Sequence, residues 1–126
     1  MAYIYFNNNP LGKSTGDCVL RAISIALDQS WDETYWDLCE CGYQMADWGD
    51  SNAVWDAYLR NRGFIRKAIP NTCPDCYTVR DFCKDFSNGV FVVGTGNHTI
   101  CIKYGNYYDS WDSGREVPIF YYQKIK

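Results

Sequence analysis

The sequence has only one histidine, His98, and it lacks long apolar runs and any excess of basic residues. With one imidazole in the chain, all histidine chemistry must use His98. No segment approaches the roughly 20 apolar residues of a transmembrane helix, and residues 1–6 are too short for the apolar region of a secretion signal. A net charge of −3 and a pI of 5.0 give no electrostatic basis for binding nucleic acid or an anionic membrane. We therefore expect a cytoplasmic protein with no nucleic-acid or membrane partner.

The seven cysteines are an odd number, which argues against a closed set of disulfides. In a reducing compartment we expect most of them to be free thiols. A chain of 126 residues is long enough for one core and too short for two ordinary domains. Residues 1–126 are therefore predicted to form a single domain.

Apolar spacing and capping residues predict helices in the first two-thirds of the chain and strands mainly after it. Ser30 with Glu33 is a capping-box sequence, and Asp17 is suited to the N-cap position. The predicted helices start after Asp17, after Ser30, at Ser51 or Asn52, and at Thr78. The predicted strands cover residues 3–6, 64–69, 90–93, 99–104, 106–109 and 117–123, with a tight turn at Gly105-Asn106. The fold class is α+β, with N-terminal helices packed on one side of a small C-terminal antiparallel sheet.

The aromatic share of the chain is high, at 17%. Large side chains give a small domain much of its apolar area, so the core is expected to contain most of the tryptophans of the helical half: Trp31, Trp36, Trp48 and Trp55. Two adjacent pairs of tyrosines lie on predicted strands, so one tyrosine of each pair must face away from the core: Tyr107-Tyr108 and Tyr121-Tyr122. Exposed aromatic surface of this kind can line a peptide groove or form a homodimer contact.

Cys18 is the candidate nucleophile because it begins a predicted helix directly after Gly16 and Asp17. A free thiol has an unperturbed pKa of about 8.5 and is mostly protonated at neutral pH. The backbone N–H groups and dipole of a helix N-terminus favour the thiolate, and a neighbouring imidazolium favours it further. Gly16 would leave room for a substrate carbonyl. The structural alternative is that Cys18 is a small buried apolar residue, as most helical cysteines are.

His98 and Asp109 are the candidate partners of that thiol. Covalent catalysis requires a base within hydrogen-bonding reach of the nucleophile, itself oriented by a third group. Asp109 follows on the next predicted strand and can lie across the sheet or diagonally from His98. Asp112 is the second candidate for this role, and Trp111 is suited to shield the pair from water. Singly, His98 could be a polar residue at a strand start and Asp109 a turn cap, but with Cys18 they have the order that a thiol hydrolase requires.

These segments resemble the papain-like cysteine peptidase superfamily, especially its small bacterial and phage members and the peptidase domains that process bacteriocin leaders. Residues 16–22, Gly-Asp-Cys-Val-Leu-Arg-Ala, are similar to the helix that carries the nucleophile, and Asp109-Ser110-Trp111 is similar to the Asn-Ser-Trp segment, with Asp in place of Asn. The resemblance implies a papain-like fold with Cys18 as nucleophile, His98 as general base and Asp109 as orienting residue. The function that we expect is a thiol-dependent amide hydrolase, a peptidase or a deamidase, acting on a peptide or protein without a cofactor or a metal.

The oxyanion hole is where the sequence departs from that family. Papain-type enzymes have a Gln a few residues before the cysteine, and this chain has Gly12 at that spacing. Asn9 is the predicted replacement, together with the backbone N–H of Cys18. Loss of one oxyanion donor costs on the order of 10²–10³ in rate. The alternative function is therefore a catalytically inactive papain-like binding protein, of phage or mobile-element origin, that acts on a host protein.

A zinc-stabilised interaction module is a further alternative, because Cys73-Pro74-Asp75-Cys76 has the spacing of a metal knuckle. Cys39 and Cys41 could add ligands, but two positions apart on a helix they point to nearly opposite faces. As a redox pair, Cys73 and Cys76 lack the preceding strand of the usual motif. A loop held by buried thiols before the helix at Thr78 fits this segment better.

Overall fold

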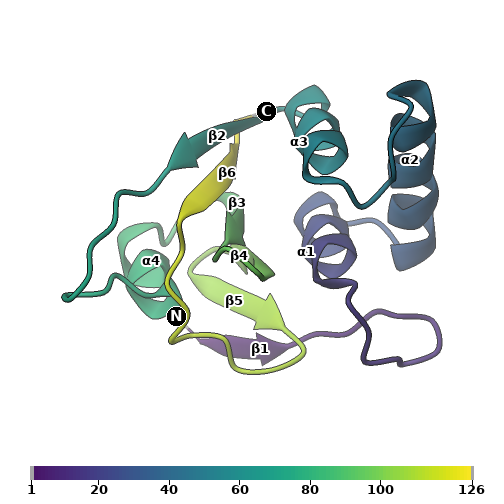
Figure 1. Ribbon diagram of the computed structural model, residues 1–126. Helices are drawn as coiled ribbons and strands as arrows, with labels where there is room; N and C mark the ends of the chain where they lie inside the picture. The colour runs from purple at the N-terminus through teal and green to yellow at the C-terminus, as the bar shows by residue number, and fades with distance from the viewer. Residues whose placement is uncertain (1, 126) are drawn as a thin grey trace.

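The computed structural model describes residues 2–125 and places four helices and a six-stranded mixed sheet within them (Figure 1). The α+β class is confirmed. The helices are α1 (Cys18–Leu27), α2 (Trp31–Gln44), α3 (Asn52–Asn61) and α4 (Val79–Asp85). The strands are β1 (Tyr3–Tyr5), β2 (Phe64–Ala68), β3 (Val90–Gly94), β4 (Thr99–Lys103), β5 (Asn106–Asp109) and β6 (Phe120–Lys124). Within the described residues, no helix combines the length and the apolar character that crossing a membrane requires.

The sheet has the strand order β1-β5-β4-β3-β6-β2. At its β1 edge the strand direction differs from the antiparallel sheet that was predicted. β1 pairs in parallel with β5, with Tyr3 aligned with Tyr107, whereas every other pair is antiparallel. The prediction of an antiparallel sheet is therefore wrong at this edge. Parallel strands need a long crossover, and here that crossover is the whole helical region and the central strands.

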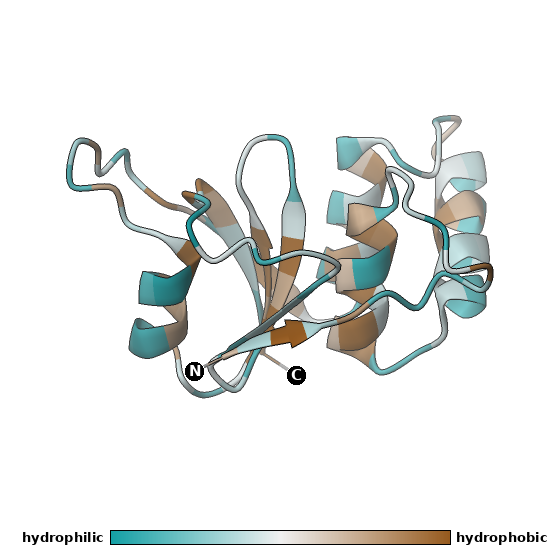
Figure 2. Ribbon diagram, turned by 90° about the horizontal axis from the view of Figure 1, so that it is seen from below, coloured by the Kyte–Doolittle hydropathy of each residue, from teal (hydrophilic) through white to brown (hydrophobic). Residues whose placement is uncertain are grey.

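Helices cover both faces of the sheet, so the expectation that they pack on one side is also wrong. Figure 1 shows α4 on one side of the strands and α1, α2 and α3 on the other. Val92 and Cys101 pack in the cluster that contains α1, whereas Phe91 and Ile100 pack with α4. Apolar residues thus alternate to both faces of β3 and β4, and both faces have to be covered. In Figure 2 the apolar segments concentrate in the strands and in the helices beside them.

The strand tyrosines are covered for the same reason. Tyr107 and Tyr122 are buried, and their neighbours Tyr108 and Tyr121 are half-buried against the opposite clusters. The predicted exposed tyrosine of each pair is therefore not exposed, because a helix lies on each side.

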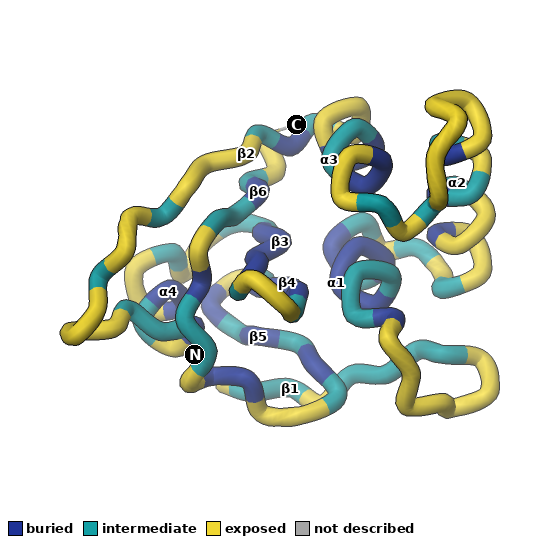
Figure 3. The backbone as a smooth tube through the Cα atoms, viewed as in Figure 1, coloured by how far each residue is buried: buried dark blue, intermediate teal, exposed yellow. Residues whose placement is uncertain are grey.

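Four exposed aromatic residues lie on α2 and the loop after it: Tyr35, Trp36, Tyr43 and Trp48. Among the four tryptophans that were expected mostly in the core, only Trp55 is buried, whereas Trp36 is 70% and Trp48 80% exposed. α2 packs against α1 and α3 and leaves its outer surface in solvent (Figure 3). A homodimer contact through exposed aromatics stays a prediction, and it now concerns this helix rather than the strands.

Capping explains where the helices begin. The Ser30 hydroxyl accepts a hydrogen bond from the Glu33 amide at 3.0 Å, and Thr78 with Asp81 forms a reciprocal capping box. The turn between β4 and β5 falls at Tyr104 and Gly105, one residue earlier than predicted, and both residues have positive φ.

Candidate functional site

Cys18 is the first residue of α1, where its backbone N–H has no partner within the helix. The residue is half-buried. Burial works to raise the pKa of the thiol, but hydrogen bonds from His98 and from the Thr99 backbone, with the charges of His98 and Arg21, outweigh it. The pKa of Cys18 is therefore lowered from its ordinary value, which means that more of the thiol is present as the reactive thiolate.

The turn between β3 and β4 positions His98 beside Cys18. The turn is closed by a hydrogen bond of 2.9 Å from the Thr95 amide to the His98 carbonyl, and Gly96 supplies a φ of +101°. At the base of the turn, a Cβ on Gly94 would overlap the Phe120 ring, so only glycine fits there. The imidazole therefore sits at the end of a rigid hairpin rather than on a free loop.

Asp109 ends β5 and binds the imidazole of His98. His98 Nε2 lies 2.5 Å from Asp109 Oδ2, and the two side chains are 11% and 2% exposed. Because Nε2 is engaged by Asp109, Nδ1 is the nitrogen left to face the thiol. Burial works against protonation, but the hydrogen bonds and charges of Asp109 and Cys18 raise the pKa of His98 to about 9. The arrangement therefore favours a thiolate–imidazolium pair.

The Asp109 carboxylate is itself held by several donors. Its Oδ2 accepts from the Ser113 hydroxyl at 2.7 Å, and its Oδ1 accepts from the Ser110 amide at 2.8 Å. The backbone carbonyl of Asp109 accepts from the Phe6 amide at 2.8 Å and from the Tyr3 hydroxyl at 3.2 Å. Asp109 is thus fixed by both the C-terminal loop and the N-terminal strand.

Trp111 contacts His98, whereas its neighbour Asp112 does not. The Trp111 ring lies 4.9 Å from the His98 ring, centroid to centroid, so it covers one face of the imidazole. Asp112 instead accepts hydrogen bonds from the Tyr107 hydroxyl, at 2.5 Å, and from Arg80. Of the two predicted acidic partners, the structure brings Asp109 to His98 and leaves Asp112 outside.

Arg21 and Asp17 are site residues that the sequence reasoning did not assign. Arg21 lies one turn after Cys18, is only 6% exposed, and forms a buried ion pair with Asp17. Its Nη2 also lies 3.7 Å from Asp109 Oδ1, so its guanidinium connects α1 to the end of β5. Asp17 was predicted as the N-cap of α1 and does occupy that position, but its side chain caps no backbone N–H of the helix. Its carboxylate instead binds Arg21 and accepts a hydrogen bond from the Trp31 indole at 3.0 Å. The sequence did contain a sign of this role, because Arg21 lies on the apolar face of a predicted helix.

The cavity beside Cys18 and His98 has a volume of about 200 Å³. Asn52 and Asn97 are among the residues that line it, and Asn9 is not. The Asn9 side chain donates to Asp17 Oδ2 at 3.3 Å and accepts from the Leu11 amide at 2.9 Å. The structure therefore gives no support to Asn9 as an oxyanion donor, because its amide fixes the loop before α1.

The remaining cysteines have different environments. Burial raises the pKa of Cys83 to about 11 and that of Cys101 to about 12, so both are unreactive thiols. Cys73 and Cys76 form a disulfide, so the segment is not the loop of buried free thiols that was expected. Among residues 2–125, no group of three His, Cys, Asp or Glu side chains is arranged to hold a metal ion, which leaves the zinc alternative without a site there.

Comparisons with known proteins give no relative: no protein-family model, curated protein or solved structure matches the chain significantly.

Proposed function

We propose that this protein is a thiol-dependent amide hydrolase, a cysteine peptidase or deamidase of papain-like type. The observation that carries the proposal is the relay from Cys18, at the N-terminus of α1, through His98 to the buried Asp109, with 2.5 Å between His98 Nε2 and Asp109 Oδ2. The directions of the two pKa shifts support the same chemistry, because a lowered thiol pKa and a raised imidazole pKa favour the charged pair.

The reaction follows from these positions. The Cys18 thiolate attacks the amide carbon, a S–C bond forms, and the carbonyl electron pair moves onto oxygen. Collapse of this intermediate breaks the C–N bond, and His98 gives its proton to the leaving nitrogen, which leaves an acyl-thioester. A water molecule then attacks the thioester while His98 takes its proton, and release of the acid regenerates the thiolate and imidazolium. Asp109 holds the ring in place and stabilises its positive form.

The oxyanion donors in this proposal are the Cys18 backbone N–H and the side chain of Asn52. Asn52 lines the Cys18 cavity, and its Oδ1 accepts from the Trp55 indole at 3.0 Å. That contact fixes which end of the amide is the acceptor and leaves its NH₂ group as the free donor. Asn52 takes the role for which Asn9 was predicted.

The test is the pH dependence of iodoacetamide labelling at each cysteine, read by peptide mass spectrometry in the wild type and in His98→Ala. We expect Cys18 of the wild type to label at a lower pH than an ordinary thiol does, because its pKa is lowered. In His98→Ala, the labelling rate should rise only near the ordinary thiol pKa of about 8.5. Cys83 and Cys101 are internal controls that should stay unlabelled in the native protein.

The alternative, an inactive papain-like binding protein, is favoured by one observation: the predicted Asn9 donor is committed elsewhere. Labelling of Cys18 that resembles an ordinary thiol, and that His98→Ala does not change, would support this alternative and contradict the proposed hydrolase.

A further inference from the structure

A second, larger cavity lies next to the Cys18 cavity, at the N-terminal end of α1. It has a volume of about 540 Å³ and is formed by α1, α2 and the loop between α2 and α3. It begins at Gly16 and Asp17, directly before Cys18, and Val19 lines both this cavity and the one that contains Cys18 and His98. A substrate bound over the thiol therefore lies within reach of it. We refer to this cavity as the aromatic groove.

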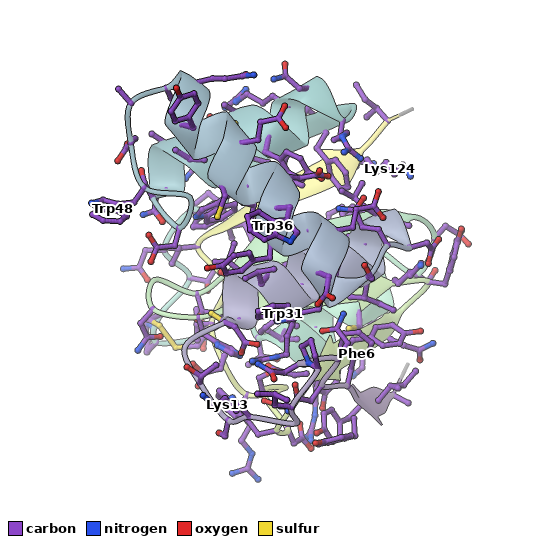
Figure 4. All side chains as sticks on the ribbon, turned by 90° about the vertical axis from the view of Figure 1, so that its right-hand side faces the viewer. Phe6, Lys13, Trp31, Trp36, Trp48 and Lys124 are labelled. Carbon is purple, nitrogen blue, oxygen red and sulfur yellow. A yellow bond between two sulfur atoms is a disulfide. The ribbon has the colours of Figure 1, made fainter. Side chains whose placement is uncertain are left out.

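The walls of the aromatic groove are flat rings. Trp31 and Tyr35 stack with their centroids 5.2 Å apart and an angle of 17° between the planes. The Trp31 indole is held by its hydrogen bond to Asp17, so this wall is fixed before any ligand arrives. Trp48, on the loop after α2, is 80% exposed and also lines the groove. Figure 4 looks at this side of the molecule, with Trp31 at the start of α2 and Trp48 at the edge.

Acidic residues predominate in the part of the chain that forms most of the aromatic groove. Residues 22–59 contain no Lys or Arg and hold eight of the fifteen Asp and Glu residues of the chain: Asp28, Asp32, Glu33, Asp37, Glu40, Asp47, Asp50 and Asp56. Three of these acids have basic partners: Asp28 pairs with Lys103, Asp37 with Arg62, and Asp56 with Arg60 one turn further along α3.

Asp50 differs from these paired acids, because it lines the groove and forms no salt bridge with any described residue. The other carboxylate of the groove, Asp17, is already neutralised by Arg21. Asp50 is therefore the uncompensated charge of the groove.

We propose that the aromatic groove binds an arginine or lysine side chain of the substrate next to the amide that Cys18 attacks. The aliphatic stem and the charged head of such a side chain pack on the rings of Trp31, Tyr35 and Trp48, because aromatic faces attract cations. The head then reaches Asp50. This inference rests on the proposed function, and it names its substrate class: a polypeptide with a basic residue beside the scissile bond.

A purely apolar side chain fits this groove less well. It would use the rings, but it would cover the Asp50 carboxylate without giving it a partner, and a buried carboxylate without a partner costs free energy. An acidic side chain would be repelled by Asp50 and by the acidic surface around it. The chemistry of the groove therefore selects the basic side chains.

The first arm of the test measures binding in Cys18→Ala, which cannot turn over its ligand. A randomised peptide pool is passed over the immobilised variant, and the retained peptides are sequenced by mass spectrometry. A retained peptide is then compared with its copy that has citrulline in place of arginine, which keeps the shape and removes the charge. We expect the citrulline copy to bind at least about ten-fold more weakly, a difference of about 1.4 kcal/mol.

Variants of residues that line the aromatic groove test whether the preference for arginine arises there. Added to Cys18→Ala, Asp50→Asn should remove most of the arginine-over-citrulline preference, and Trp48→Ala should weaken the binding of both peptides. Asp75→Asn is the matched charge control, since Asp75 is exposed on the distant loop between Cys73 and Cys76. Tyr43→Ala is the aromatic control, because Tyr43 is 86% exposed on α2 and does not line the groove.

The second arm treats the active protein with the same pool and sequences the products. Cleavage beside basic residues supports both proposals. Binding that depends on arginine and on Asp50, without cleavage, supports the groove and contradicts the hydrolase. Cleavage or binding that is equal for arginine and citrulline, or that favours apolar residues, overturns the basic-side-chain inference and leaves the hydrolase standing.

Discussion

Cys18 begins α1 and Cys101 lies on β4, the strand that packs against α1, and yet the two thiols have opposite properties. Cys101 is completely buried among apolar side chains, and burial raises its pKa to about 12. Cys18 is also substantially covered, but its pKa is lowered, because His98, the Thr99 backbone and Arg21 favour the thiolate more than burial disfavours it.

The comparison shows that depth alone does not decide the reactivity of a thiol in this protein. The two cysteines differ in what faces the sulfur: an imidazole backed by a carboxylate at Cys18, and side chains of the α1 cluster at Cys101. A buried thiol without such partners stays protonated, and the same side chain beside an imidazolium becomes a nucleophile. Removing the partners of Cys18 should therefore make it resemble Cys101.

The largest expected effect comes from Asp109→Asn, which removes the charge behind His98. Because Asp109 helps to raise the pKa of His98 to about 9, that pKa should fall toward its ordinary value of 6.5 in the variant. The chain has one histidine, so its single imidazole Hε1 signal in a proton NMR titration reports this value directly. Amide hydrolysis should fall by a factor of about 10²–10⁴. Asp112→Asn is the matched control, and a His98 titration that moves equally in both variants would contradict the assignment of Asp109.

A smaller effect is expected from Arg21→Met, which removes the buried cation between Asp17 and Asp109. Breaking a buried ion pair by deleting one partner costs about 3–5 kcal/mol, so the free energy of unfolding in a urea titration should fall by about that amount. The pKa of Cys18 should rise, because Arg21 is one of the charges that lower it.

The double variant Arg21→Met with Asp17→Asn separates the stability role of Arg21 from its effect on the thiol. It should recover part of the stability, since the Asp17 charge is no longer left unpaired, but it should not restore the labelling of Cys18 at a lower pH than an ordinary thiol. Full recovery of both would show that Arg21 serves the fold alone.

The smallest effect is expected from Cys101→Ala, on the other side of the comparison. The change removes one buried sulfur, and the free energy of unfolding should fall by about 1 kcal/mol, which a thermal or urea melt can measure. Iodoacetamide labelling of Cys18 should keep its rate and its pH dependence. A clear change in Cys18 labelling would mean that the two thiols are linked through α1.

Local signals in the sequence were enough to place the elements. Ser30, Thr78 and the apolar periodicity located the helices, and alternating β-branched and aromatic residues located the strands to within a few positions. The sheet edges depend on contacts between distant residues, such as Tyr3 with Tyr107, and no local pattern reports them. The covering of both sheet faces was also missed, although the continuous apolar runs of β3 and β4 were a usable sign of it.

Some residues of the candidate site could also be predicted from the sequence, and others could not. His98 and Asp109 could be placed together because the tight turn between β4 and β5 brings their strands side by side. Cys18 was joined to them through the order of residues that a thiol hydrolase requires, not through any local geometry. Asn9 could not be tested from the sequence, since its role depends on which neighbour its amide finds, and it finds Asp17. Arg21 was missed as a site residue because its partner Asp109 lies on a strand far along the chain.

The pairing of β1 with β5 also bears on when the environment of Cys18 can form during synthesis of the chain. The ribosome makes Cys18 long before His98 and Asp109, and the Asp109 carbonyl is fixed by the first strand, through Phe6 and Tyr3. A nascent chain that stops short of β4 and β5 therefore carries an ordinary thiol at position 18. The groups that lower the pKa of Cys18 therefore reach it only after the beginning and the later part of the chain have come together.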